Sequence, residues 1–304
     1  MSYVFGPVPS RRLGRSLGVD LVPFKMCTYD CIYCQLGCTT DKSLERQPFV
    51  PADKVLEEIK EKIALKPDYI TLSGSGEPTL YTGIGDIIEG IRAFTDIPIA
   101  LITNGSLLWK KEVRQAIANA HLIIPSLDAG NTLMFNAVNR NHPDISFEQM
   151  LDGLIALRDD FTGTIWLEVF ILSGYTADIA EVKQMAACAK RIRPDRIQLN
   201  TVTRPPAEEF AMTVNQAQLE EMCQYFEPEA EVIADFREVH NQTDFTTTRD
   251  AVEEMLQRRP CSIDDITTGL HIHRHEALKH LQELLADKRI EMVRTVNRIF
   301  YRTC

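Results

Sequence analysis

The sequence predicts a mixed α/β protein in which a parallel sheet, covered by helices and curved into a partial or complete barrel, precedes a small helical domain. Short runs of β-branched and apolar residues alternate with helical patterns through the first 240 residues, which is typical of βα units. The predicted strands are apolar almost throughout, as expected of strands buried on both faces. After residue 244 the pattern changes, which indicates a second domain.

Six strands and five helices are predicted in the body. The strands cover residues 18–22, 69–73, 97–103, 121–127, 164–172 and 196–200. The helices cover residues 51–65, 83–94, 109–120, 146–160 and 178–192. Ser146 begins the fourth helix and Gln149 lies three residues on, a capping-box pattern. Six βα units favour a partial TIM-type barrel, (βα)6, in a domain spanning residues 1–240.

Residues 245–304 predict a winged helix-turn-helix domain. A helical pattern stops at Pro260, a short helix follows Ser262 as its N-cap, a longer helix covers 271–286, and the remaining residues alternate like a hairpin. This segment carries ten Lys and Arg against nine Asp and Glu. Its near-neutral charge leaves three roles open: binding a nucleic acid, binding a peptide or protein, or a structural role.

Charge and composition narrow the class of protein. The formal net charge of −10 argues against a protein that coats nucleic acid through bulk electrostatics. No apolar run approaches the roughly 20 residues of a membrane-spanning helix, and no signal peptide is evident. We therefore expect a cytoplasmic protein with no membrane partner. Four of the eight cysteines lie within residues 27–38, which in a reducing compartment indicates metal binding.

Small and polar residues follow five of the predicted strand positions. These stretches read "CTYDCIYC" (27–34), "SGSGEP" (73–78), "TNGS" (103–106), "SLDAG" (126–130) and "NTVTRPP" (200–206). In βα barrels and doubly wound sheets, ligands bind at the carboxyl ends of the strands. The five stretches should therefore converge on one face and form an active site.

The cysteines of the first stretch carry a family resemblance. Cys27, Cys31 and Cys34 are spaced CxxxCxxC, Tyr33 precedes the last of them, and a Gly-Glu-Pro sequence follows the next strand. Three thiolates are an incomplete set for a structural zinc site. With these motifs, about residues 10–235 resemble the radical S-adenosylmethionine (SAM) enzymes.

The resemblance implies two cofactors and an electron donor. The three cysteines would ligate a 4Fe–4S cluster, and because most such clusters have four cysteine ligands, one iron is left open for SAM. Reductive cleavage of SAM would give a 5'-deoxyadenosyl radical, with the electron supplied by an external flavodoxin or ferredoxin. The protein would hold the cofactor and exclude side reactions.

The resemblance also implies the SAM contacts. Gly76 and Glu77 match a Gly-Gly-Glu-Pro motif, with Ser75 replacing its first Gly, and Glu77 would hold the methionine ammonium. Tyr33 would pack near the adenine. The positions that match ribose and carboxylate contacts in relatives are Thr103, Asn104, Ser126 and Asp128. Turn capping is the alternative role for these four residues.

Three further candidate residues lie outside the motifs that match the family. Glu168 and Asn200 lie in or at the end of later strands, where a buried carboxylate needs a partner. Cys38 is expected to be an ordinary residue, with a fourth ligand and a reactive thiol as the alternatives.

The N-terminal "GPVPSRRLGRSLG" resembles a radical enzyme group related to wyosine-base tRNA synthases. Its Arg11, Arg12 and Arg15 either bind a phosphate or carboxylate or pair with acidic residues. Archaeal wyosine synthases carry a further cysteine triad upstream of this motif. No cysteine precedes Cys27 here, so wyosine synthesis itself is not expected.

Two function classes follow from these motifs. The first is an enzyme that cleaves SAM and modifies a substrate, either a tRNA or a peptide or protein delivered by the C-terminal domain. The second is an iron-sulfur regulatory protein that senses redox state, with the winged helix as its output. A sensor needs only the cluster, whereas the Glu77, Thr103 and Ser126 strand ends belong to a site that also holds a nucleotide-like ligand. The sequence therefore favours the enzyme.

Overall fold

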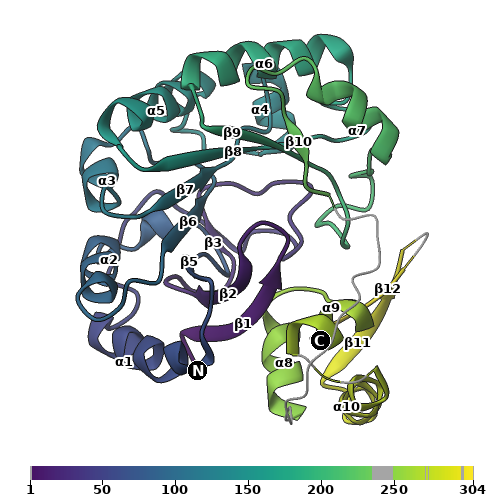
Figure 1. The fold of residues 1–304 in the computed structure, drawn as a ribbon. Helices are drawn as coiled ribbons and strands as arrows, with labels where there is room; N and C mark the ends of the chain where they lie inside the picture. The colour runs from purple at the N-terminus through teal and green to yellow at the C-terminus, as the bar shows by residue number, and fades with distance from the viewer. Residues whose placement is uncertain (1, 235–248, 271, 273, 296–297, 304) are drawn as a thin grey trace.

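The body of the protein is an eight-stranded sheet that curves into an open, partial barrel (Figure 1). The computed structural model describes residues 2–234 and 249–303 except 271, 273, 296 and 297. Along the sheet the strands follow the order β1-β2-β5-β6-β7-β8-β9-β10. Strand β1 is antiparallel to β2, and all the other neighbours are parallel. Because β1 and β10 are the edges, the barrel is open between them.

The elements of the body are as follows. The sheet strands are β1 (Val4–Ser10), β2 (Gly14–Val19), β5 (Tyr69–Leu72), β6 (Ile99–Thr103), β7 (Leu122–Pro125), β8 (Thr164–Phe170), β9 (Arg196–Asn200) and β10 (Glu231–Val232). A small separate pair is formed by β3 (Met26–Cys27) and β4 (Asp41–Lys42). The helices are α1 (Ala52–Lys62), η1 (Ile63–Leu65), η2 (Pro78–Leu80), α2 (Ile84–Arg92), α3 (Lys111–Ala116), α4 (Thr132–Val138), α5 (Phe147–Asp160), α6 (Ile179–Ile192) and α7 (Gln216–Cys223).

The predicted parallel α/β fold is confirmed, with shifted boundaries at several strands. Each of the six predicted strands overlaps a strand of the sheet, and Ser146 caps α5 by accepting the Gln149 N–H at 3.1 Å. Strands β1 and β10 were not predicted. Strand β1 contains Pro7 and Pro9, which usually argue against a strand, but an edge strand tolerates proline because one side needs no hydrogen bonds.

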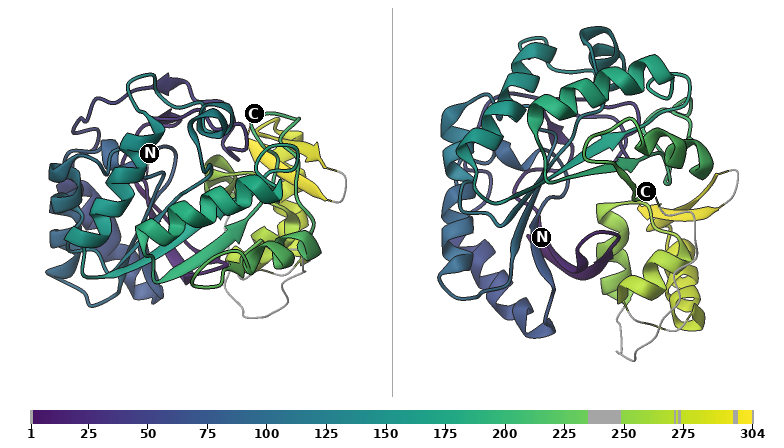
Figure 2. Two further views of the ribbon diagram at one scale, coloured as in Figure 1. Left: turned by 90° about the horizontal axis from the view of Figure 1, so that it is seen from above. Right: turned by 45° about the horizontal axis from the view of Figure 1, so that its top comes forward.

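Helices cover the outer face of the sheet, and the main core lies between the two layers (Figure 2). A second, smaller cluster contains Leu13, Ala100, Leu122 and Ile124. Side chains alternate between the faces of a strand, so the second cluster lies on the inner face of the barrel. Leu13 comes from the β1–β2 turn and is only 2% exposed. The turn therefore fills part of the barrel interior.

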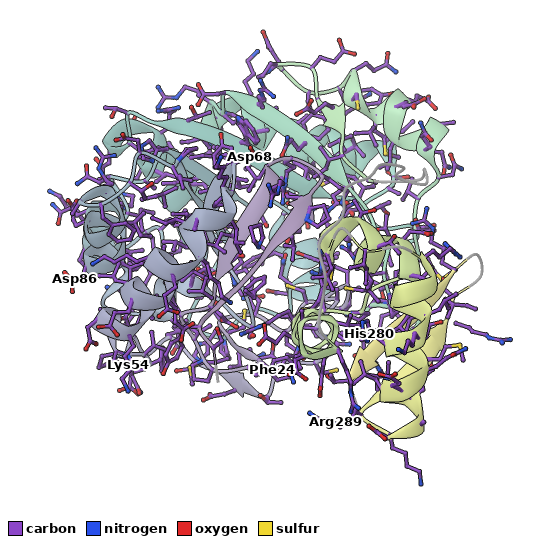
Figure 3. The ribbon with its side chains drawn as sticks, turned by 60° about the horizontal axis from the view of Figure 1, so that its bottom comes forward. Phe24, Lys54, Asp68, Asp86, His280 and Arg289 are labelled. Carbon is purple, nitrogen blue, oxygen red and sulfur yellow. The ribbon has the colours of Figure 1, made fainter. Side chains whose placement is uncertain are left out.

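The same turn is fixed to the start of β5. The Arg15 N–H donates to Asp68 Oδ2 at 2.7 Å, and Asp68 is labelled in Figure 3. Gly14 precedes Arg15 with a φ of +59°, and an added Cβ there would lie 2.3 Å from Asp68 Oδ2. The turn thus requires glycine for both its conformation and its close approach to Asp68.

The C-terminal segment contains three helices and a hairpin. They are α8 (Arg249–Arg258), α9 (Ile263–Leu270), α10 (Arg274–Ala286), β11 (Ile290–Arg294) and β12 (Ile299–Thr303). Ser262 and Asp265 cap α9 reciprocally: the Asp265 N–H donates to Ser262 Oγ, and the Ser262 N–H donates to Asp265 Oδ2. The winged helix-turn-helix assignment and the domain ranges 1–240 and 245–304 stay predictions. Residues 235–248 and residue 271 lie outside the described residues.

This segment packs against the open edge of the barrel (Figures 1 and 2). Helix α9 contacts β1, and Val8 joins the apolar cluster of the C-terminal helices. An added Cβ at Gly269 would lie 3.0 Å from Pro9 Cδ, so the helix approaches the strand closely. Among the described residues, no helix is long and apolar enough to cross a membrane.

Replacing Leu13 with Ala should destabilise the protein by about 2–5 kcal/mol, because it removes a buried side chain and leaves a cavity in the barrel. The measurement is the urea midpoint of unfolding. Leu133→Ala is the matched control, since Leu133 is 72% exposed and its loss should change the midpoint little. Equal midpoints for the two variants would show that Leu13 is not part of the core.

Candidate active site

The predicted polar stretches meet at the carboxyl ends of the parallel strands, as expected of this fold. The cysteine loop and the loop after β5 are joined directly: the Glu77 N–H donates to the Met26 carbonyl at 3.1 Å, and the Lys25 N–H donates to the Ser75 carbonyl at 2.7 Å. An added Cβ at Gly76 would lie 1.8 Å from the Met26 oxygen. Gly76 is therefore required where the two loops touch.

Each of the three predicted ligand sulfurs accepts one N–H from a different side chain. Asn104 Nδ2 lies 3.5 Å from Cys27 Sγ, and Asn139 Nδ2 lies 3.4 Å from Cys31 Sγ. The third donor is the Lys25 ammonium, 3.8 Å from the sulfur of Cys34. The Asn139 amide favours the thiolate form of Cys31.

Burial opposes that form in the metal-free thiols. It is the main cause that raises the pKa of Cys27 to about 12, with the Glu77 carboxylate as the next cause. Burial also raises the pKa of Cys31, and the neighbouring Asp128, Cys27 and Cys34 raise it further. The three sulfurs are thus close enough to interact electrostatically. Any metal bound here must displace protons from Cys27 and Cys31.

Glu77 is buried and joins two loops. Its carboxylate accepts the Thr79 N–H at 3.0 Å, the Thr103 hydroxyl at 2.6 Å and the Asn104 N–H at 2.8 Å, together with the Thr79 hydroxyl. Burial raises the pKa of Glu77, and these hydrogen bonds counteract the rise. No Lys or Arg of the described chain forms an ion pair with it. The site therefore contains a buried carboxyl group that has no counterion within the described part of the chain.

Asp128 and Tyr33 form a second polar group. The Tyr33 hydroxyl and Asn139 Nδ2 both donate to Asp128 Oδ2, the latter at 2.7 Å. Oδ1 of Asp128 is buried without a well-formed hydrogen bond among the described residues. The Tyr33 ring stacks on Phe170 with centroids 3.9 Å apart. Oδ1 is thus a buried acceptor near the aromatic pair, on a carboxylate that also interacts with the Phe170 N–H.

The remaining candidates lie farther along the sheet. Ser126 pairs with Glu168 through a backbone bridge. Glu168 forms an ion pair with Arg12 and accepts Asn200 Nδ2 at 3.0 Å. Burial alone would raise the pKa of Glu168, but Arg12 and Asn200 more than offset it, so the pKa lies below its ordinary range. Arg12 is therefore the partner expected for the buried Glu168 carboxylate.

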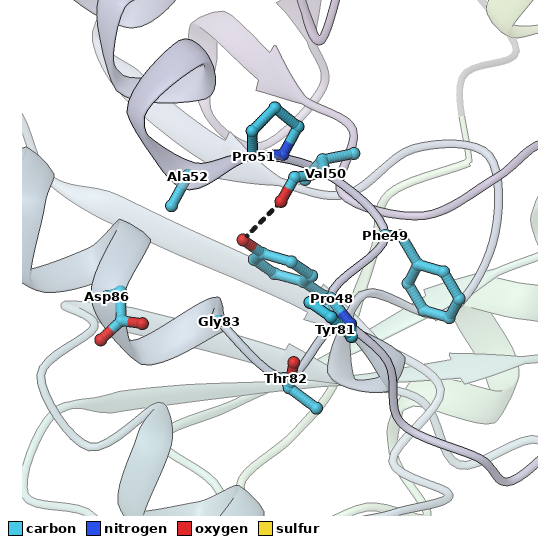
Figure 4. Close-up of a pocket in the computed structure, with 9 residues that line it drawn as sticks. All are labelled: Pro48, Phe49, Val50, Pro51, Ala52, Tyr81, Thr82, Gly83 and Asp86. Carbon is cyan, nitrogen blue, oxygen red and sulfur yellow. Dashed lines mark hydrogen bonds between the residues drawn. The ribbon is translucent and has the colours of Figure 1, made fainter.

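Two further features lie at the surface. Cys38 is exposed, unlike the partly buried triad. A hollow of about 680 Å³ is lined by residues 48–52, 81–83 and 86, with the Tyr81 hydroxyl donating to the Val50 carbonyl at 2.9 Å (Figure 4). None of the predicted site residues lines it, so we do not assign the chemistry to this hollow.

Sequence reasoning missed three residues of the site: Lys25, Asn139 and Asp20. Asn139 follows α4 and is 108 residues from Cys31, so no local pattern links them. Asp20 accepts the Ser75 N–H at 3.1 Å and its hydroxyl, and thereby holds the loop after β5. Only Lys25 lies near the cysteine motif in the sequence, although nothing in that motif requires a lysine.

Comparisons with known proteins agree with the fold. Residues 21–186 match the Radical SAM superfamily. The chain belongs to the radical SAM superfamily. Solved structures show the same fold: a radical SAM methyltransferase from Sphaerobacter thermophilus has a TM-score of 0.57 at 14% identity, covering 73% of this chain and 67% of its own. Streptococcus suis SuiB bound to SAM has a TM-score of 0.53 at 14% identity, over 72% of this chain and 49% of its own.

Curated relatives include UPF0026 proteins. A UPF0026 protein of Synechocystis is 36% identical over 203 residues, 66% of this chain and 76% of that protein. A UPF0026 protein of Methanocaldococcus jannaschii is 39% identical over 214 residues, 69% of this chain and 66% of that protein. A Brachyspira hyodysenteriae protein named GTPase Obg is 37% identical over 292 residues, 94% of this chain. The alignment spans 43% of that last protein, less than half its length.

Asp128 should make stability depend on pH. Burial is the main cause that raises its pKa to about 6, from an ordinary value of 3.8. A carboxyl with a raised folded-state pKa contributes stability that is fully present below the unfolded pKa and is lost as the pH rises through the folded pKa. Relative to wild type, Asp128→Asn should therefore gain up to about 3 kcal/mol in free energy of unfolding between about pH 4 and about pH 7.

Urea unfolding of the iron-free chain across that pH range measures this difference. Asp144→Asn, at a side chain that is 79% exposed, controls for the removal of a carboxyl group. A difference between Asp128→Asn and wild type that does not change with pH would contradict the assignment.

Proposed function

We propose that this chain is an enzyme that binds a 4Fe–4S cluster through Cys27, Cys31 and Cys34 and cleaves SAM reductively beside it. The observation that supports this proposal most is that each of the three sulfurs has its own N–H donor. The loop that carries the cysteines is also hydrogen-bonded to the Gly76–Glu77 turn. Membership of the radical SAM superfamily supports a radical reaction.

The cysteines suit a cluster better than a single metal ion. Among the described residues, no three His, Cys, Asp or Glu side chains converge closely enough to hold one ion. A tetrahedral ion with bonds of about 2.3 Å requires its sulfur ligands to be close together. In a 4Fe–4S cluster each cysteine binds a different iron, so the sulfurs lie farther apart.

Other residues of the site suit SAM. The buried Glu77 carboxyl has no counterion among the residues described, so a cationic ligand such as the methionine ammonium is favoured beside it. Its four hydrogen bonds also give Glu77 a positioning role between two loops. Oδ1 of Asp128 has no well-formed hydrogen bond among the described residues, and we assign it as an acceptor for a ribose hydroxyl. We assign the remaining SAM contacts to Tyr33, Gly76, Thr103, Asn104 and Ser126.

The chemistry of the bound groups follows from the family. When bound, the cluster and SAM together supply a 5'-deoxyadenosyl radical that abstracts a hydrogen atom from the substrate. The chain's own residues hold these groups and exclude water from them. An external flavodoxin or ferredoxin would supply the electron. The C-terminal segment, packed on β1, would present the substrate, a tRNA or a peptide or protein.

The cluster assignment is tested by reconstituting the protein anaerobically, adding SAM and dithionite, and measuring 5'-deoxyadenosine by mass spectrometry. Cys31→Ala should lose both the iron and the product, because a thiolate ligand is removed. Cys38→Ala is the matched control, since this exposed cysteine of the same loop should be dispensable. Equal iron content in the Cys31→Ala protein and wild type would refute the ligand assignment.

Glu77→Ala should keep the cluster but weaken SAM binding by about tenfold or more, because it removes a charge-assisted contact and frees two loops. Equilibrium dialysis with labelled SAM, alongside iron analysis, measures both effects. Glu61→Ala on the exposed surface of α1 is the control. Wild-type affinity in the Glu77→Ala protein would mean that the SAM site lies elsewhere.

A further inference from the structure

Four arginine side chains from distant parts of the sequence gather at the open side of the barrel. Arg11 and Arg12 lie in the β1–β2 turn, Arg204 follows β9, and Arg259 connects α8 to α9. We call them the arginine cluster. Arg12 reaches Gln198 of β9 at 3.3 Å, and the other three residues interact electrostatically with one another.

Only two of these cations have a carboxylate partner among the described residues. Arg12 pairs with Glu168, and Arg204 Nη2 lies 3.1 Å from Asp265 Oδ1. The side chain of Arg11 donates instead to a backbone carbonyl, 3.3 Å away. Four guanidinium groups against two carboxylates leave an excess of two positive charges.

The excess charge affects the arginines themselves. Burial is the main cause that lowers the pKa of Arg11 to about 10, and the Arg204 guanidinium is the next cause. Burial followed by Arg204 likewise lowers the pKa of Arg259. Like charges held together in this way are unfavourable unless an anion binds between them.

The arginine cluster has an unused N–H donor among the described residues and lies next to the cysteine loop. The Arg11 side chain is exposed to solvent and therefore accessible to a ligand. Arg204 Nε is buried without an acceptor among the described residues. Arg204 Nη1 donates to Gln35 Oε1 at 3.3 Å, and Gln35 follows Cys34 directly. An anion bound to the arginine cluster would therefore lie beside the loop that is proposed to hold the 4Fe–4S cluster.

We propose that the arginine cluster binds a phosphate group of the substrate. Guanidinium groups bind phosphate through paired N–H donors. A phosphomonoester carries about −1.5 to −2 charges and three acceptor oxygens, which matches the excess of two positive charges better than a carboxylate does. Only the identification of the ligand as the substrate rests on the proposed function; the binding itself does not.

The phosphate could belong to a small phosphomonoester, or to a nucleic-acid backbone, in which two successive phosphodiesters with one negative charge each would balance the same excess. Isothermal titration calorimetry of the full chain with glycerol 2-phosphate tests the first source, and fluorescence anisotropy with a short single-stranded RNA tests the second. Both are run at constant ionic strength, because phosphate binding depends strongly on salt. Sodium acetate provides the carboxylate comparison.

We expect wild type to bind at least one phosphate probe, and Arg11→Gln and Arg259→Gln each to weaken that binding at least about tenfold. Arg191→Gln is the matched control, because its side chain is 58% exposed on α6 and should not affect binding. Circular dichroism confirms that the variants are folded. Cys31→Ala should bind phosphate like wild type, which separates this proposal from the cluster assignment.

Binding that is unchanged in both Arg11→Gln and Arg259→Gln would overturn the proposal. Equally, it would be overturned if wild type bound neither phosphate probe, or bound acetate as tightly as glycerol 2-phosphate. Loss of 5'-deoxyadenosine formation with intact phosphate binding would instead count against the proposed reaction alone.

Discussion

The buried Glu77 carboxylate is the interaction on which the rest of the site depends. By accepting hydrogen bonds from Thr79, Thr103 and Asn104 it joins the loops that follow β5 and β6. Burying a carboxylate is costly unless it is hydrogen-bonded, and these bonds offset that cost. Asn104, held through its backbone N–H, can then direct its side-chain amide at Cys27 Sγ. Local loop geometry at one strand end thus sets the surroundings of a cysteine on another loop.

Most of the fold could be predicted because its signals are local. Apolar runs mark the parallel strands, and the polar motifs follow them directly, so the site-bearing loops were identified together. Strand β1 was missed because Pro7 and Pro9 contradict the usual strand pattern. Asn139 was missed for a different reason: only the folded chain brings its amide to Cys31. Contacts between distant residues leave no local pattern in a single sequence.

The β1–β2 turn shows how neighbouring residues acquire different roles. The sequence left phosphate binding and ion pairing open for its arginines, and the structure separates them. Arg12 supplies the buried partner of Glu168, whereas Arg15 Nε is buried without an acceptor among the described residues. Within the part of the chain that the structure describes, Arg11 forms no ion pair, and its side chain donates to a carbonyl after β10. The turn can hold these cations because Leu13 anchors it in the barrel interior.

The C-terminal segment is tied to the site at two points. Arg258 forms an ion pair with Asp20, the residue that holds Ser75, and Asp265 pairs with Arg204, which reaches Gln35 beside the cysteines. Asp20 is nearly inaccessible, so moving the segment away would leave its buried charge without its ion-pair partner, which is unfavourable. The segment is therefore coupled to the loops that carry the proposed chemistry. A ligand that moves the C-terminal segment would therefore change the conformation of those loops. By reciprocity, a ligand bound to the loops would change the affinity of the segment for its own ligand.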